Sequence, residues 1–135
     1  MALVVPDAAE ARILESFLAG PLTLRLFGNN YVPIATSLAA NFTEIVGNIY
    51  TSQPLLLASW VITLNNPSLA VHPMLSWVFT GIINAPGTIY GYFVTRDSDG
   101  FLMWAERFDA AYAPIVPINN SIIQLVPQFS SSSVY

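Results

Sequence analysis

The sequence predicts a mainly β protein: a single antiparallel β-sandwich or jelly-roll domain preceded by one N-terminal α-helix. Short runs rich in β-branched and aromatic residues recur along the chain, each bounded by Gly, Pro, Asn or Asp. One segment near the N-terminus has helical periodicity instead. The length of 135 residues suits one domain. We therefore expect an arm and helix over residues 1–20, the β domain over 21–129 and a Ser-rich tail over 130–135.

The helix is expected within PDAAEARILESFLAG, residues 6–20. Asp7 is the expected N-cap, with Glu10 three residues later completing a capping box. Gly20 followed by Pro21 is a stop signal. Helical spacing puts four apolar residues on one face, which is our candidate attachment surface: Ile13, Leu14, Phe17 and Leu18. The preceding MALVV is an apolar arm, either a terminal strand, a frayed end or a reach to a neighbouring subunit.

The first strand is expected at LTLRLF, residues 22–27, with the leucines on one face and Thr23 and Arg25 on the other. Residues 31–54 have a loop-like composition and are long enough to hold a short strand or a single helical turn. Further strands are expected at 55–64, before the turn signal at 65–67, and at 74–83.

After a turn at NAPG, residues 84–87, the chain predicts a β-hairpin in TIYGYFVTRDSDGFLMWAERF. Its strands are residues 88–95 and 101–108, and Gly100 is expected to take a positive φ in the loop between them. Tyr90 and Tyr92 should share a face. Both faces are apolar, so the hairpin is either central or covered by a partner. The candidate subunit interface is therefore Tyr90, Tyr92, Trp104, Glu106, Arg107 and Phe108.

The last strand is expected at SIIQLVPQF, residues 121–129. Pro127 lies inside it, which predicts an edge or bulge position because proline cannot donate to a β ladder.

Charged residues make up only 9% of the chain and hydrophobic residues 54%, whereas soluble domains are about 25% charged. There is no lysine; 12 Ser, 8 Thr and 9 Asn supply most of the polarity. Either the domain carries a neutral polar surface, or other subunits cover part of the apolar excess, as in obligate assemblies. The second interpretation is favoured because large exposed apolar patches are uncommon on monomers.

The net charge of −4 and four scattered arginines argue against nucleic acid as a partner. No run reaches the ~18 apolar residues of a membrane span, so we expect no membrane partner. The N-terminus has no basic leader and is not expected to be a signal peptide. The absence of cysteine excludes thiol chemistry.

We expect no catalytic residue, metal or cofactor. His72 is the single histidine and has no visible nucleophile or acid beside it in the sequence. Asp97 and Asp99 have the spacing of a calcium loop, but the pattern breaks after Gly100, which favours two aspartates bonding a turn.

Glu106 and Arg107 are neighbours on a strand and should face opposite sides, so each needs its own partner if buried, such as an ion pair with another strand or subunit. Glu44, Glu106 and Asp109 could meet as paired acids, although nothing in the sequence requires it. Five aromatics could form a sugar-binding surface but are more typical of a core: Trp60, Trp77, Tyr90, Tyr92 and Trp104.

Four motifs taken in order resemble a family of small virion structural proteins of tailed bacteriophages: LTLRLFGNN, NFTEI, TIYGYFVTRDSDGFLMWAERF and SIIQLVPQF. The resemblance extends from about Leu22 to Phe129, and the YGYFV…LMWAERF hairpin is its most specific part.

The resemblance implies a non-catalytic particle component on the virion, most simply a capsid cement or decoration protein on the outer surface of the head. Its partners would be copies of itself, with a homotrimer favoured, and the major capsid protein. The alternatives are a tail or baseplate accessory protein, or a module that binds host carbohydrate receptors.

Overall fold

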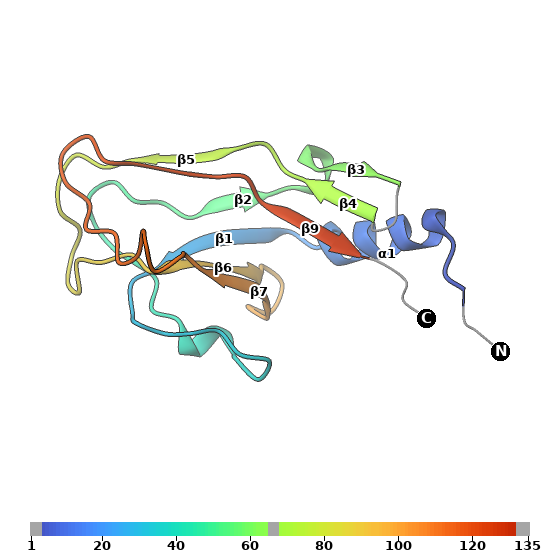
Figure 1. The fold of residues 1–135 in the computed structure, drawn as a ribbon, viewed down its shortest axis with the longest axis horizontal. Coiled ribbons are helices and arrows are strands. Elements are labelled where there is room, and N and C mark those ends of the chain that lie inside the picture. Colours follow the sequence, from blue (N-terminus) through green and yellow to red (C-terminus); the bar gives the residue numbers. More distant parts are fainter. Residues whose placement is uncertain (1–3, 65–67, 132–135) are drawn as a thin grey trace.

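The computed structural model describes residues 4–64 and 68–131 and confirms a mainly β protein with one N-terminal helix. Helix α1 lies at one end of an elongated molecule, beside the strands β3, β4 and β9 (Figure 1). The strands form antiparallel sheets of four, three and two strands. Within the described residues these sheets do not close into a barrel.

Helix α1 spans Asp7–Ala19 and ends where Gly20 and Pro21 predicted. The expected capping box is wrong: Pro6 occupies the N-cap position, and no side chain caps the helix. Glu10 turns inward instead, because the spacing i, i+4, i+8 places it on the same stripe as Leu14 and Leu18. That stripe is the face that packs on β3, β4 and β9.

The four-stranded sheet has the order β2-β1-β6-β7. Its strands are β1 (Leu22–Phe27), β2 (Gln53–Leu55), β6 (Gly91–Arg96) and β7 (Leu102–Arg107). The bounds of β1 are those predicted, and its leucines are buried while Thr23 and Arg25 are half-buried. Leu24 lies opposite Val94, so the apolar alternation of both strands faces one core.

The other two sheets are smaller. One has the order β3-β4-β9, from β3 (Val61–Thr63), β4 (Ser68–Val71) and β9 (Gln128–Ser131). The second pairs β5 (Leu75–Val78) with β8 (Ile122–Leu125). Side chains of all three sheets and of α1 meet in one main core, with Leu14, Leu24, Ala70, Trp77 and Ile123 among its members.

Three expected strands are corrected by the structure. Residues 55–64 do not form one strand: β2 ends at Leu55, a 3-10 turn covers Leu57–Ser59, and β3 follows. The strand expected at 74–83 is confined to β5. Residues 121–129 divide into β8 and β9, which pair in different sheets, because the chain breaks its ladder at the buried Pro127.

The expected C-terminal tail begins inside a strand. Ser130 pairs with Leu69 and Ser131 with Ser68, so β9 extends two residues into the segment predicted as a tail. Residues 132–135 and the turn expected at 65–67 lie outside the described residues. Strand β4, which follows that turn, was not predicted.

The long segment after β1 folds back over the four-stranded sheet. It contains one 3-10 turn at Ala39–Asn41 and β2, which agrees with the expected short elements. Phe42 stacks on Phe93 at 5.0 Å and meets Phe27 edge-on at 4.9 Å. These three rings form a second, smaller core on the face of the sheet opposite the main core.

The β6–β7 hairpin closes at Gly100 as predicted, although β6 begins at Gly91 rather than at residue 88. Gly100 has φ +71 and donates its N–H to the carbonyl of Arg96 at 2.7 Å. The turn at NAPG is also present, with Gly87 donating to Asn84 at 2.9 Å. A β-bulge at Val94/Thr95 shifts the register so that Met103 is the extra residue on β7.

Candidate assembly surface

His72, the single histidine of the sequence, has structural contacts on its ring. His72 is 6% exposed, its Nδ1 lies 2.8 Å from the carbonyl oxygen of Pro73, and its ring packs edge-on against Trp60. In residues 4–64 and 68–131, no hydroxyl or carboxylate is hydrogen-bonded to this ring, and no group of three or more His, Asp or Glu could hold a metal. The same part of the chain has no helix long and apolar enough to cross a bilayer.

Asp97 and Asp99 are turn residues, as predicted. Thr23 donates its hydroxyl to Asp97 Oδ1 at 2.6 Å. Arg96 forms a bidentate pair with Asp99 at 3.0 and 2.6 Å, and the N–H of Phe101 donates to Asp99 Oδ1. The hydrogen bonds from Arg96 and Phe101 lower the pKa of Asp99 to about 2.

Two of the predicted interface residues belong to the core of their own chain. Tyr92 is 6% exposed and donates its hydroxyl to Glu106 Oε2 at 2.8 Å. Burial, followed by that hydrogen bond, raises the pKa of Tyr92 above its ordinary range. The half-buried Trp104 packs against Phe17 and Phe129 at ring distances of 5.8 and 5.4 Å. These residues therefore position the hairpin.

Tyr90 and Tyr92 do not share a face, which corrects the sequence prediction. Strand β6 begins at Gly91, so the strict alternation of a strand does not extend to Tyr90. Tyr90 joins the smaller core, and the guanidinium of Arg107 lies 4.7 Å from the centre of its ring. Arg107 also donates to the carbonyl of Tyr31 at 3.2 Å.

Glu106 is the exposed member of the predicted set and Phe108 is half-buried. The ion pairs within the described residues are Arg25–Glu44 at 2.9 Å and Arg96–Asp99 at 2.6 Å, so among those residues neither Glu106 nor Arg107 has an ionic partner. Glu44 is tied to Arg25 and Tyr50, whereas Glu106 and Asp109 line one hollow. The three acids expected as a possible cluster are thus divided.

The four residues predicted to form an attachment surface on the helix differ in their exposure. Leu14 and Leu18 are fully buried in the main core and Phe17 is half-buried. Ile13 is 54% exposed, which leaves it as the apolar member available to a partner. The main role of helix α1 is therefore to cover the three-stranded sheet β3-β4-β9.

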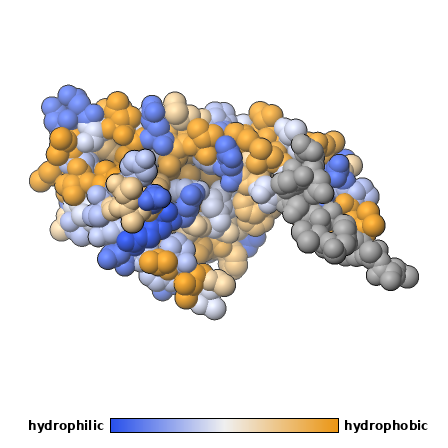
Figure 2. Space-filling model, in the orientation of Figure 1, coloured by the Kyte–Doolittle hydropathy of each residue, from blue (hydrophilic) through white to orange (hydrophobic). Residues whose placement is uncertain are grey.

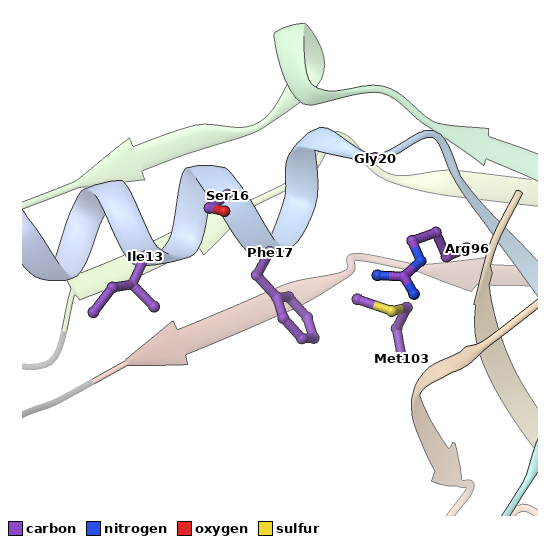
Figure 3. A pocket seen from close by; sticks show the side chains of 6 residues that line it. All are labelled: Ile13, Ser16, Phe17, Gly20, Arg96 and Met103. Atoms are coloured by element: carbon purple, nitrogen blue, oxygen red, sulfur yellow. The ribbon is translucent and has the colours of Figure 1, made fainter. Parts of the chain in front are cut away.

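Three hollows lie along β7. The first, about 470 Å³, separates α1 from the hairpin, with Phe17, Arg96 and Met103 projecting into it (Figure 3). A second, about 390 Å³, lies between Leu102–Ala105 and the 33–37 loop. A third, about 340 Å³, lies between the end of β7 and β8. Residues of β7 therefore line a hollow at each part of the strand.

A second apolar region was missed by the sequence analysis. Hydrogen bonds from Thr80 to Asn48, from Asn84 to Val46 and from Asn120 to Phe79 bring three turn segments together. Their exposed side chains form what we call the distal patch: Val46, Ile49, Ile82, Val116 and Ile118. Figure 2 shows hydrophobic residues at this end, away from α1, as well as elsewhere on the face that it draws. The sequence feature that could have revealed the distal patch is the presence of β-branched residues inside turn-rich segments.

The comparisons with known proteins give no relative. No protein-family model matches the chain. No curated protein and no solved structure matches it either.

Proposed function

We propose that this protein is a non-catalytic virion structural protein, most simply a capsid cement or decoration protein that binds the outer head lattice and stabilises it. The observation that carries the proposal is the exposed apolar surface. Among the described residues, twenty large hydrophobic side chains are at least 38% exposed. Contiguous apolar patches are uncommon on monomers, and five of these side chains belong to the distal patch.

Other subunits are the simplest cover for this surface. The interfaces of obligate assemblies are apolar and depleted of charge, as is this chain with its 9% charged residues. A decoration protein would bind copies of itself, with a trimer favoured by the family resemblance, and the major capsid protein. Several weak contacts on one lattice would then add through effective concentration.

Sedimentation equilibrium of the full chain tests self-association. We expect an oligomer at micromolar concentration, whereas a monomer at all concentrations would contradict the assembly part of the proposal. Cosedimentation with phage heads that lack the protein tests attachment. Saturable binding to heads supports decoration, and binding to tails alone supports the tail or baseplate alternative.

The carbohydrate-binding alternative has less support. Trp60 and Trp77 are buried in the main core, so they offer no face to a sugar. A glycan array with saturable binding would nevertheless favour that function over capsid attachment.

A two-layer sandwich or jelly roll is likewise a proposal about the fold. Its support is that the small sheets and the four-stranded sheet share one core. An experimental structure of the assembled protein would test it.

A further inference from the structure

We propose that β7 pairs in antiparallel fashion with β7 of a second copy, joining two four-stranded sheets across a two-fold axis at Ala105. This inference rests on the proposed self-association and names the surface that mediates it.

The backbone of β7 has an unpaired edge. β7 is the outermost strand of its sheet, and Phe108 donates its N–H to Tyr90 in the β6 direction. Because the direction of backbone groups alternates in an antiparallel strand, Ala105 and Arg107 direct their N–H and C=O away from β6. No backbone partner for these outward groups is found within residues 4–64 and 68–131. An edge of this kind is a template for another strand.

The two edges of this sheet differ in how they are protected. The opposite edge is β2, which has three residues and contains Pro54, both of which discourage pairing. β7 has six residues, with neither proline nor lysine. Its protective features are the charged Glu106 and Arg107 and the bulge at Met103, which leaves the stretch from Trp104 onward regular.

The space beside β7 can accommodate an incoming strand. The three hollows that border β7 are lined by Met103 in the first, Leu102–Ala105 in the second, and Glu106 with Phe108 in the third. They provide space on the flanks of the strand rather than a closed pocket for a small molecule.

A second copy is the occupant we favour because the strand is complementary to itself. A two-fold axis at Ala105 pairs the outward groups of Ala105 with those of Ala105 of the second copy. The smallest side chain of the strand then lies at the axis. Glu106 lies opposite Trp104 of the second copy, and no like charges face each other.

A neighbouring register is less favourable. A two-fold axis at Glu106 would also match outward groups, but it would place the two exposed Glu106 carboxylates directly opposite one another. Like charges opposite one another across a strand pair destabilise it. The side chains thus select the axis at Ala105.

The contact at β7 closes as a dimer, because a two-fold interface uses the same patch twice. Larger symmetric assemblies would need another surface in addition. The distal patch lies on a different part of the molecule and could provide it.

Residue-resolved amide exchange on the wild-type chain is the first test. In the dimer, the Ala105 amide should become protected as concentration rises through the association range measured by sedimentation. The Glu106 amide bonds to β6 and should stay protected throughout, as an internal control. Free exchange of Ala105 in an associated protein would overturn the inference while leaving self-association intact.

A pair of proline variants is the second test. Ala105→Pro removes an N–H that the fold does not use, and loss of one hydrogen bond from each copy should weaken dimerisation at least about 30-fold. Gln124→Pro is the matched control. Gln124 lies opposite Ser76 at a non-hydrogen-bonded position of the β5–β8 pair, so its N–H points away from β5. Circular dichroism and urea unfolding must show both variants folded.

The outcomes separate the two proposals. Selective weakening by Ala105→Pro supports β7 self-pairing. Equal weakening by both variants would overturn it in favour of β7 pairing with β8 of another copy. A wild-type chain that is monomeric at every concentration, with Ala105 exchanging freely, would overturn both this inference and the proposed self-association.

Discussion

At the scale of single residues, the polar side chains fix the long loop onto the sheet. Tyr50 donates its hydroxyl to Glu44 Oε2 at 2.6 Å and accepts the N–H of Leu26 at 3.1 Å. Glu44 in turn pairs with Arg25 on β1. Burial, followed by the hydrogen bond to Glu44, raises the pKa of Tyr50 far above its ordinary value of 10.0. The neutral phenol is therefore the form that the fold requires.

The Tyr50→Phe variant should lose stability at neutral pH, because the N–H of Leu26 loses its acceptor; we expect about 1–3 kcal/mol. The pH dependence follows from the raised pKa. Above pH ~10 the unfolded chain ionises Tyr50 while the folded chain keeps it neutral, so the unfolding free energy falls as pH rises. The variant should show a smaller alkaline loss than the wild type.

Urea unfolding at neutral and alkaline pH measures both effects. Tyr112→Phe is the control, since Tyr112 is exposed. Tyr92 has its pKa raised in the same direction, so part of the alkaline loss should remain in Tyr50→Phe. An unchanged alkaline slope would show that Tyr50 ionises freely in the folded protein.

At the scale of elements, helix α1 contains a buried carboxyl group that lowers the stability of the fold. Glu10 is 1% exposed, and neither of its carboxylate oxygens has a hydrogen-bond partner among the residues that the structure describes. A buried polar group without a hydrogen-bond partner is destabilising. The sequence places Glu10 on the buried stripe by its spacing to Leu14, so helix docking is weaker than an apolar residue there would make it.

Glu10→Met should therefore stabilise the protein, by about 1–3 kcal/mol, because it replaces an unsatisfied group by an apolar side chain of similar length and helix propensity. Glu15→Met on the exposed face of the same helix should change stability by less than about 0.5 kcal/mol. Urea unfolding of the two variants makes the comparison. A loss of stability in Glu10→Met would mean that the carboxylate is stabilised in the folded protein.

At the scale of the whole molecule, the exposed apolar surface is the main feature. The core is complete, since all three sheets and α1 contribute to it, yet Ile49 and Ile82 in the distal patch are each 74% exposed. Side chains this exposed contribute little to the stability of the single chain. Their expected role is contact with another subunit.

The double variant Ile82→Ser/Ile118→Ser should keep the unfolding free energy within about 0.5 kcal/mol for each substitution, as exposed positions do. If a partner buries both side chains, its binding should weaken by about 100-fold or more, at ~1.5 kcal/mol or more for each isoleucine. Sedimentation and binding to phage heads measure the loss. Val61→Ser on β3, another exposed apolar position, is the control. Binding equal to wild type would show that the distal patch stays in water.

The sequence by itself determined what depends on neighbouring residues: the end of α1 at Gly20, the bounds of β1, the closure of the hairpin at Gly100 and the mainly β class. It also pointed to the β6–β7 hairpin, although not to the unpaired edge of β7. Only the tertiary structure decided that residues 121–129 serve two sheets, that Glu10 is buried and that turn segments with exposed isoleucines come together. These features depend on which distant segments pack together, and that choice is made by the free energy of the whole core rather than by local preference.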